Sequence, residues 1–159
     1  MIQTTRCKLT ILQNDDWELV MKLYTNIKVR YFLGGIVDLQ NIHSKFLTML
    51  ESDLNTKHWV VRVQNRSCDA IGIVSLGKHH NNIDTEISYQ LLPEWWNKGY
   101  GSEVVKAIVD YALIFEKLER VIAETQIANI ASCRLLKGIG MRLEQIVERY
   151  GAKQGIFST

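Results

Sequence analysis

The chain has 159 residues, of which 47% are hydrophobic, and a formal net charge of +2. This length fits one domain with its own core, and the small charge argues against a protein built to neutralise nucleic-acid phosphates. Cys7, Cys68 and Cys133 are widely spaced and odd in number, which fits neither a disulfide framework nor a CxxC metal motif. The apolar run of the central helix, residues 111–115, is far shorter than a membrane span.

These limits define the class of protein that we expect. Free thiols favour a reducing, cytoplasmic compartment, so we predict a single cytoplasmic domain over residues 1–159. We also predict no bound metal, no direct nucleic-acid binding and no membrane association. His79 and His80 form a pair, but no further ligand lies at a matching spacing, so we expect them on a surface loop.

The first third of the chain alternates between strand and helix signals. Residues 7–13 alternate between apolar and polar side chains and predict a strand. Asn14 or Asp15 begins the next helix, which carries apolar residues at near-helical spacing: Trp17, Val20, Tyr24 and Ile27. After an apolar loop at residues 31–35, Asp38 caps a second helix, whose apolar side comprises Leu39, Ile42, Phe46, Met49 and Leu50.

From His58 onward, strands dominate. Two strands with a turn at residues 65–67 predict a hairpin, and a third strand precedes the helix at residues 101–117. A strand, a short helix that Asn129 begins, a further strand and a short final strand complete the chain: residues 120–126, 129–138, 141–149 and 155–157. This order predicts an α/β (α+β) fold with a mixed sheet of six to seven strands and helices on both faces.

The chain is organised around residues 85–117. Glu86, Ser88 and Gln90 alternate with an apolar row that comprises Ile87, Tyr89 and Leu91. Pro93 ends the strand, and Gly99 and Gly101 let the backbone turn tightly and approach a ligand. The helix that follows has unpaired N–H groups and the positive end of its dipole at its start, which together form an anion site. We therefore predict that this loop holds a pyrophosphate and that Glu86 performs proton chemistry beside it.

Two stretches, EISYQLLPEWWNKGYGSE and NIASCRLLKGIGMR, resemble the GNAT superfamily of N-acetyltransferases, in particular the branch that contains the ribosomal-protein alanine acetyltransferases. The family's Q/R-x-x-G-x-G/A loop, which binds the pyrophosphate of acetyl-CoA, reads here as residues 96–101. The resemblance implies a mostly antiparallel central sheet and direct transfer of an acetyl group from acetyl-CoA to a primary amine in a ternary complex. Trp96 stands where Gln or Arg is usual, and Leu136 stands where many members have the Tyr proposed to protonate the thiolate.

The same resemblance assigns site residues. Glu86 is the candidate base, directly or through water, and Ser132 is the candidate donor to the departing thiolate; the alternatives are a solvated carboxylate and an ordinary helix-start serine. Asn129 either contacts the cofactor or only caps its helix. The cofactor-binding set expected from the resemblance comprises Leu91, Leu92, Trp96, Asn97, Lys98, Gly99, Tyr100, Gly101, Ser102, Asn129 and Ser132.

Several alternatives remain open at this point. A dinucleotide-binding oxidoreductase shares the GxG pattern, but here residues 93–98 separate the strand from the first glycine, and Val104 is too bulky for the third glycine position. A non-catalytic acyl-CoA-binding module on the same fold is the second alternative. The acceptor is a small-molecule amine or the N-terminus of a peptide or protein, and the resemblance allows a homodimer.

Overall fold

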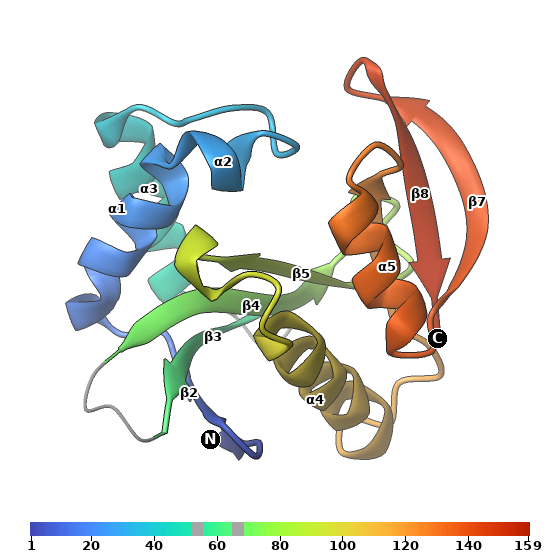
Figure 1. Ribbon diagram of the computed structural model, residues 1–159, viewed down its shortest axis with the longest axis horizontal. Helices are drawn as coiled ribbons and strands as arrows, with labels where there is room; N and C mark the ends of the chain where they lie inside the picture. The colour runs from blue at the N-terminus through green and yellow to red at the C-terminus, as the bar shows by residue number, and fades with distance from the viewer. Residues whose placement is uncertain (52–55, 65–68) are drawn as a thin grey trace.

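The computed structural model describes residues 1–51, 56–64 and 69–159, and the strands of this part form one eight-stranded sheet (Figure 1). Their spatial order is β1-β2-β3-β4-β5-β6-β8-β7. The strands are β1 (Ile2–Gln3), β2 (Cys7–Ile11), β3 (Lys57–Val63), β4 (Ala70–Lys78), β5 (Thr85–Leu91), β6 (Ile122–Gln126), β7 (Arg142–Arg149) and β8 (Ala152–Ser158). The prediction of six to seven strands missed β1, whose two residues are too few to show a period. The turn predicted at residues 65–67 lies outside the described residues.

Five α-helices occur in the described part: α1 (Trp17–Thr25), α2 (Ile27–Arg30), α3 (Leu39–Leu50), α4 (Tyr100–Ile114) and α5 (Ile130–Gly138). Asp38 caps α3 as predicted, because its side chain accepts from the backbone N–H of Asn41. The prediction of one helix through Ile27 was wrong. Asn26 adopts an extended conformation and caps a new helix, α2, and this leaves Ile27 exposed. None of the described helices is long and apolar enough to cross a membrane.

The sheet separates two apolar clusters. Along β3, Val60 packs with α1 and α3, whereas Trp59 and Val61 pack with α4 and α5. In Figure 1, α1 and α3 lie above the central strands and α4 lies below them. The prediction of helices on both faces is therefore confirmed, and the period-two alternation of the strands is its cause.

One strand pair differs from all the others. Neighbouring strands pair in the antiparallel sense, except that β5 and β6 are parallel and meet at a single register position, Glu86 opposite Ile122. Beyond Glu86 the two strands diverge, and β6 continues its pairing with β8. This divergence places the second half of β5 next to a region that no strand fills, which is where the candidate site lies.

Candidate active site

The loop between β5 and α4 ends at a helix N-terminus without a capping side chain. Gly99, the N-cap residue, has a φ of +80°, and Asn97 has a φ of +57°. No hydrogen bond joins the backbone N–H groups of residues 100–102 to another described residue, and the first α4 amide that is paired belongs to Glu103. Left-handed backbone before an uncapped helix leaves several N–H groups pointing out of the helix, which is the geometry of an anion site.

The N-terminal segment holds this loop in place, a feature that the sequence analysis missed. Arg6 Nη1 donates to the carbonyl of Lys98 at 2.9 Å, and Arg6 Nε donates to Glu103 at 2.7 Å. The Arg6 guanidinium also lies 4.2 Å from the ring centroid of Tyr100. Thr4 donates its hydroxyl to Glu103 at 2.6 Å. Arg6 therefore forms an ion pair with Glu103, the acidic residue in the first turn of α4, and places a positive charge next to the loop.

The two glycines of the loop have different roles. Gly99 supplies the left-handed conformation that a side chain disfavours. At Gly101 the backbone is helical, but a Cβ atom would lie 2.8 Å from Cδ1 of Leu135 on α5. Gly101 therefore lets α4 and α5 approach each other, which is a packing role; the ligand approach expected from the sequence stays a prediction.

The residues at the end of β5 lie next to the loop. The indole N–H of Trp96 donates to the carbonyl of Leu91 at 2.8 Å, so this side chain folds back onto the end of the strand. Leu91 is buried in the α4 cluster, and the backbone N–H of Leu92 donates to Ile71 at 2.9 Å. The Nζ atom of Lys98 lies 5.6 Å from the ring centroid of Trp95. The assignment of these residues to the cofactor stays a prediction.

The start of α5 faces β5 across the point where β5 and β6 diverge. Asn129 accepts from the backbone N–H of Ser132 at 3.2 Å, which is a capping bond. Ser132 Oγ lies 2.7 Å from the hydroxyl of Tyr89 on β5. Burial raises the pKa of Tyr89 to about 12, so its hydroxyl remains protonated and can donate to Ser132. Leu136 is fully buried and packs in the core.

Tyr89 is the functional candidate that the pattern concealed. It lies in the apolar row of β5 and its ring packs against the α4 cluster, as the alternation predicts. Only its hydroxyl reaches Ser132, which is 43 positions away in the sequence. The sequence could have indicated Tyr89, because it is a tyrosine in an otherwise aliphatic row and a buried phenol needs a hydrogen-bond partner.

Glu86 lies half-buried on the opposite side of β5, at the position where β5 and β6 meet. Burial raises the pKa of the Glu86 carboxyl, and the nearby Glu124 carboxylate raises it further. The neighbouring His79 and Arg149 side chains and a backbone hydrogen bond with Glu124 oppose this shift. A half-buried carboxyl with a raised pKa is suited to accept a proton near neutral pH.

The predicted surface loop follows β4 and holds an exposed His80, but the prediction was wrong for the side chain of His79. His79 is 2% exposed, and its Nε2 lies 2.8 Å from Glu124 on β6. The backbone N–H of Asn81 donates to His79 Nδ1, so the neutral ring carries its hydrogen on Nε2 and donates to Glu124. The partner was hidden because β6 is remote in sequence and becomes a neighbour only through the sheet.

His79, His80 and Glu124 also bring three possible ligand atoms within 4.8 Å of one another. A guanidinium nitrogen of Arg149 lies 3.4 Å from the same Glu124 oxygen, and its charge opposes a divalent cation there. The absence of a metal stays a prediction.

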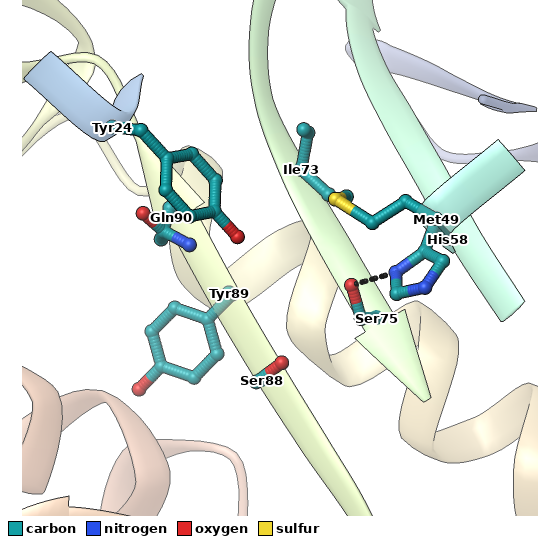
Figure 2. A pocket seen from close by; sticks show the side chains of 8 residues that line it. All are labelled: Tyr24, Met49, His58, Ile73, Ser75, Ser88, Tyr89 and Gln90. Carbon is teal, nitrogen blue, oxygen red and sulfur yellow. Dashed lines mark hydrogen bonds between the residues drawn. The ribbon is translucent and has the colours of Figure 1, made fainter. Parts of the chain in front are cut away.

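A cavity of about 140 Å³ opens beside Tyr89, between β5 and the helices α1 and α3 (Figure 2). Three neighbouring strands contribute polar groups, namely Ser88 and Gln90 on β5, Ser75 on β4 and His58 on β3, and Tyr24 contributes a hydroxyl from α1. The loop after α2 reaches over to β6, where Gln126 Nε2 donates to the carbonyl of Phe32 at 3.0 Å. The resemblance to the GNAT superfamily implies an acceptor-binding lid at this loop, residues 31–35, with a simple inter-helix connection as the alternative, and this role stays a prediction.

Comparisons with known proteins identify the family of this chain. A family model described as an acetyltransferase (GNAT) domain matches residues 6–142. The chain is 30% identical over 143 residues to the uncharacterized N-acetyltransferase YnaD of Bacillus subtilis (strain 168), which covers 90% of this chain and 83% of that protein.

Solved structures share the fold. The acetyltransferase (GNAT family) from Bacillus anthracis superposes with a TM-score of 0.83 at 22% identity, over 99% of this chain and 95% of that one. The spermidine N-acetyltransferase from Vibrio cholerae in complex with CoA and spermine gives 0.79 at 16% identity, over 97% of this chain and 94% of that one. The ribosomal-protein branch stays a prediction, but the family model covers most of the chain, and this protein is an acetyltransferase of the GNAT superfamily.

Proposed function

We propose that the protein transfers the acetyl group of acetyl-CoA directly to a primary amine in a ternary complex, in the cytoplasm. The observation that carries this proposal is the arrangement along β5. Within this strand, Glu86 lies on one face, Tyr89 contacts Ser132 from the other, and the strand leads into the uncapped start of α4. The groups proposed to contact the acceptor amine, the thioester and the phosphates therefore all lie on β5 or directly next to it.

The loop fits the phosphates of CoA. The N–H groups at the start of α4 have no capping side chain, and the Arg6 guanidinium lies beside them, so an anion would find hydrogen-bond donors and positive charge. Gly99, Tyr100, Gly101 and Ser102 would bind through their backbone. Lys98 would add a flexible ammonium, which binds phosphate as a point charge. When bound, acetyl-CoA supplies an acetyl group on a thioester.

The chain's own groups manage the protons. The Glu86 carboxylate accepts a proton from the incoming amine, directly or through water, because only the neutral amine is a nucleophile. As the C–N bond forms and the C–S bond breaks, Ser132 gives its hydroxyl proton to the departing sulfur and regains one from the attacking nitrogen, which loses it to become an amide. Tyr89 donates to Ser132 Oγ and orients that hydroxyl, and its high pKa keeps it a donor. Nothing in this scheme requires an acetylated side chain.

The acceptor is proposed to be a small-molecule amine. The structural relative from Vibrio cholerae is named a spermidine N-acetyltransferase, and the cavity beside Tyr89 is small. A peptide N-terminus would fit the same amine chemistry, and an amine panel distinguishes the two.

The test combines binding and turnover. Calorimetric titration should detect acetyl-CoA and CoA but not NADH, and thiol release should follow when an amine is added. Glu86→Gln should retain acetyl-CoA affinity and lose turnover. Binding of NADH alone would overturn the proposal in favour of an oxidoreductase, and CoA binding without thiol release from any amine would favour a non-catalytic acyl-CoA-binding module.

A further inference from the structure

Eight of the described residues line the cavity beside Tyr89: Tyr24, Met49, His58, Ile73, Ser75, Ser88, Tyr89 and Gln90. Met49 and Ile73 are apolar, and the other six carry polar groups without an ammonium, guanidinium or carboxylate. Burial lowers the pKa of His58, and its Nδ1 lies 2.7 Å from the hydroxyl of Ser75, so the ring is neutral at physiological pH. Figure 2 shows the hydroxyl of Tyr24 and the amide of Gln90 facing the same space from α1 and β5.

One group in this wall lacks a partner. Gln90 Oε1 is buried and makes no hydrogen bond to any described residue. A buried carbonyl oxygen without a partner destabilises the folded protein, and a rotation of the Gln90 amide that turned this oxygen into the cavity would let it accept from the N–H or O–H of a ligand. We therefore expect the ligand of this cavity to carry a hydrogen-bond donor that can pair with the Gln90 oxygen.

The surroundings disfavour a cation. Among the described residues, none of those that line the cavity carries a carboxylate. The guanidinium of Arg30 lies 5.0 Å from the ring centroid of Tyr24, one of the lining residues, and the same guanidinium is tied to the carbonyl of Gly35. A second ammonium in this cavity would lose its hydration without gaining a counter-ion, and it would be repelled by Arg30.

Position and size restrict the ligand further. Ser88 lies two residues beyond Glu86 on the same face of β5, which corresponds to roughly 7 Å along the strand. A cavity of about 140 Å³ is close to the size that accommodates a benzene ring, roughly 150 Å³. The group that enters it is compact and stands a short spacer away from an amine at Glu86.

From these observations we infer that the acceptor carries one reacting amine and, a short spacer away, a compact uncharged group with a hydrogen-bond donor, such as a hydroxyl or a carboxamide. The inference rests on the proposed transfer to an amine at Glu86. An enzyme for polyamines binds a substrate with a second ammonium and needs a negative charge opposite it. The described lining of this cavity offers no such charge, so we do not expect polyamines to be the preferred acceptors.

The experiment compares two amines of equal length, aminopentanol and diaminopentane, which differ only in the distal hydroxyl or ammonium. We expect kcat/KM for aminopentanol to exceed that for diaminopentane by about tenfold or more, because the distal ammonium is not compensated. Gln90→Glu should shift this ratio by about tenfold toward the diamine, because it adds a carboxylate with nearly the same shape. Gln145→Glu, on the exposed edge strand β7, is the control with the same charge change and should leave the ratio unaltered.

A second variant guards against misfolding of Gln90→Glu. Tyr24→Phe keeps the ring and removes the hydroxyl, and it should raise KM for aminopentanol several-fold while that for diaminopentane stays constant. Equal or better use of the diamine by the wild type would overturn the inference. So would a ratio that neither variant alters, provided that their thermal melts match the wild type.

Binding separates this inference from the proposed function. If acetyl-CoA binds but no thiol is released, both amines are titrated calorimetrically into the CoA-saturated protein. Binding of aminopentanol in preference to diaminopentane would support the inference even though transfer had failed, and binding of neither would refute it. Failure of acetyl-CoA to bind would count against the proposed function, and the same two titrations on the free protein would still report on the cavity.

Discussion

The contact between Tyr89 and Ser132 makes a quantitative prediction. Tyr89→Phe removes only the hydroxyl that lies 2.7 Å from Ser132 Oγ and keeps the ring that packs on the α4 cluster. If Tyr89 orients the hydroxyl of Ser132, the variant should lower kcat and leave the affinity for acetyl-CoA unchanged. Ser132→Ala removes the donor itself and should lower kcat further.

The magnitudes follow from the type of interaction. One hydrogen bond between neutral groups contributes about 1 kcal/mol, so Tyr89→Phe should lower kcat about fivefold. Loss of a proton donor to the leaving group costs roughly a hundredfold, the lower end of the range for general acid catalysis, which is the expectation for Ser132→Ala. The double variant should be no slower than Ser132→Ala alone, because Tyr89 acts only through that hydroxyl.

The assay is thiol release under saturating amine, with calorimetric acetyl-CoA affinity and thermal melting measured on each variant. Tyr150→Phe, in the exposed turn between β7 and β8, is the matched control and should behave as the wild type. Additive losses in the double variant would refute the coupling between Tyr89 and Ser132. An acetyl-CoA affinity that falls in parallel with kcat would show that Tyr89 has a structural role only.

Four further predictions concern the other parts of the site. The raised pKa of Glu86 means that its base form appears only as the pH rises through that pKa, so kcat/KM should increase with pH above the usual carboxyl range. Glu86→Gln should remove this increase, and an unaltered pH profile would count against Glu86 as the base. At neutral pH, Glu86→Gln should melt no lower than the wild type, because burial disfavours the charged form. Gly101→Ala places a methyl group against Leu135 and should destabilise the protein by about 1 kcal/mol in denaturant unfolding, a loss that Leu135→Ala in the same chain should partly reverse. Arg6→Ala should weaken acetyl-CoA binding by about two- to tenfold, since it loses the bond to the Lys98 carbonyl, whereas Lys106→Ala on the exposed face of α4 should leave the affinity unchanged.

Local patterns predicted the parts of the site that depend on one segment. The alternation along β5 correctly placed Glu86 on the face opposite Tyr89, and Asp38 began α3 where the capping pattern indicated. The break at Asn26 was missed because its cap competes with an otherwise continuous helical period.

Contacts between remote segments were beyond the reach of these patterns. The burial of His79 depends on Glu124, and the anchoring of the phosphate loop depends on Arg6, which is 97 positions before Glu103. In both cases the side chain is an ordinary polar residue in a polar stretch. Its role arises only when sheet formation places a partner against it, so no period or spacing could indicate it.

Two buried oxygens connect the energetics of the fold to its function. In the described part of the chain, Gln90 Oε1 and Glu124 Oε1 are buried side-chain oxygens without a hydrogen-bond partner. They lie on β5 and β6, the two strands that part beyond Glu86, and by the register of these strands both side chains leave the sheet on the face of Glu86. Each unsatisfied oxygen costs the folded state about 1–3 kcal/mol, and a chain selected for stability alone would replace them with apolar groups. Because an amine acceptor brings N–H donors to this face, side-chain rotations that turned these two oxygens toward it would let a bound acceptor satisfy them. Gln90→Leu should therefore raise the melting temperature while it lowers acceptor affinity, and a variant that is both less stable and equally active would contradict this account.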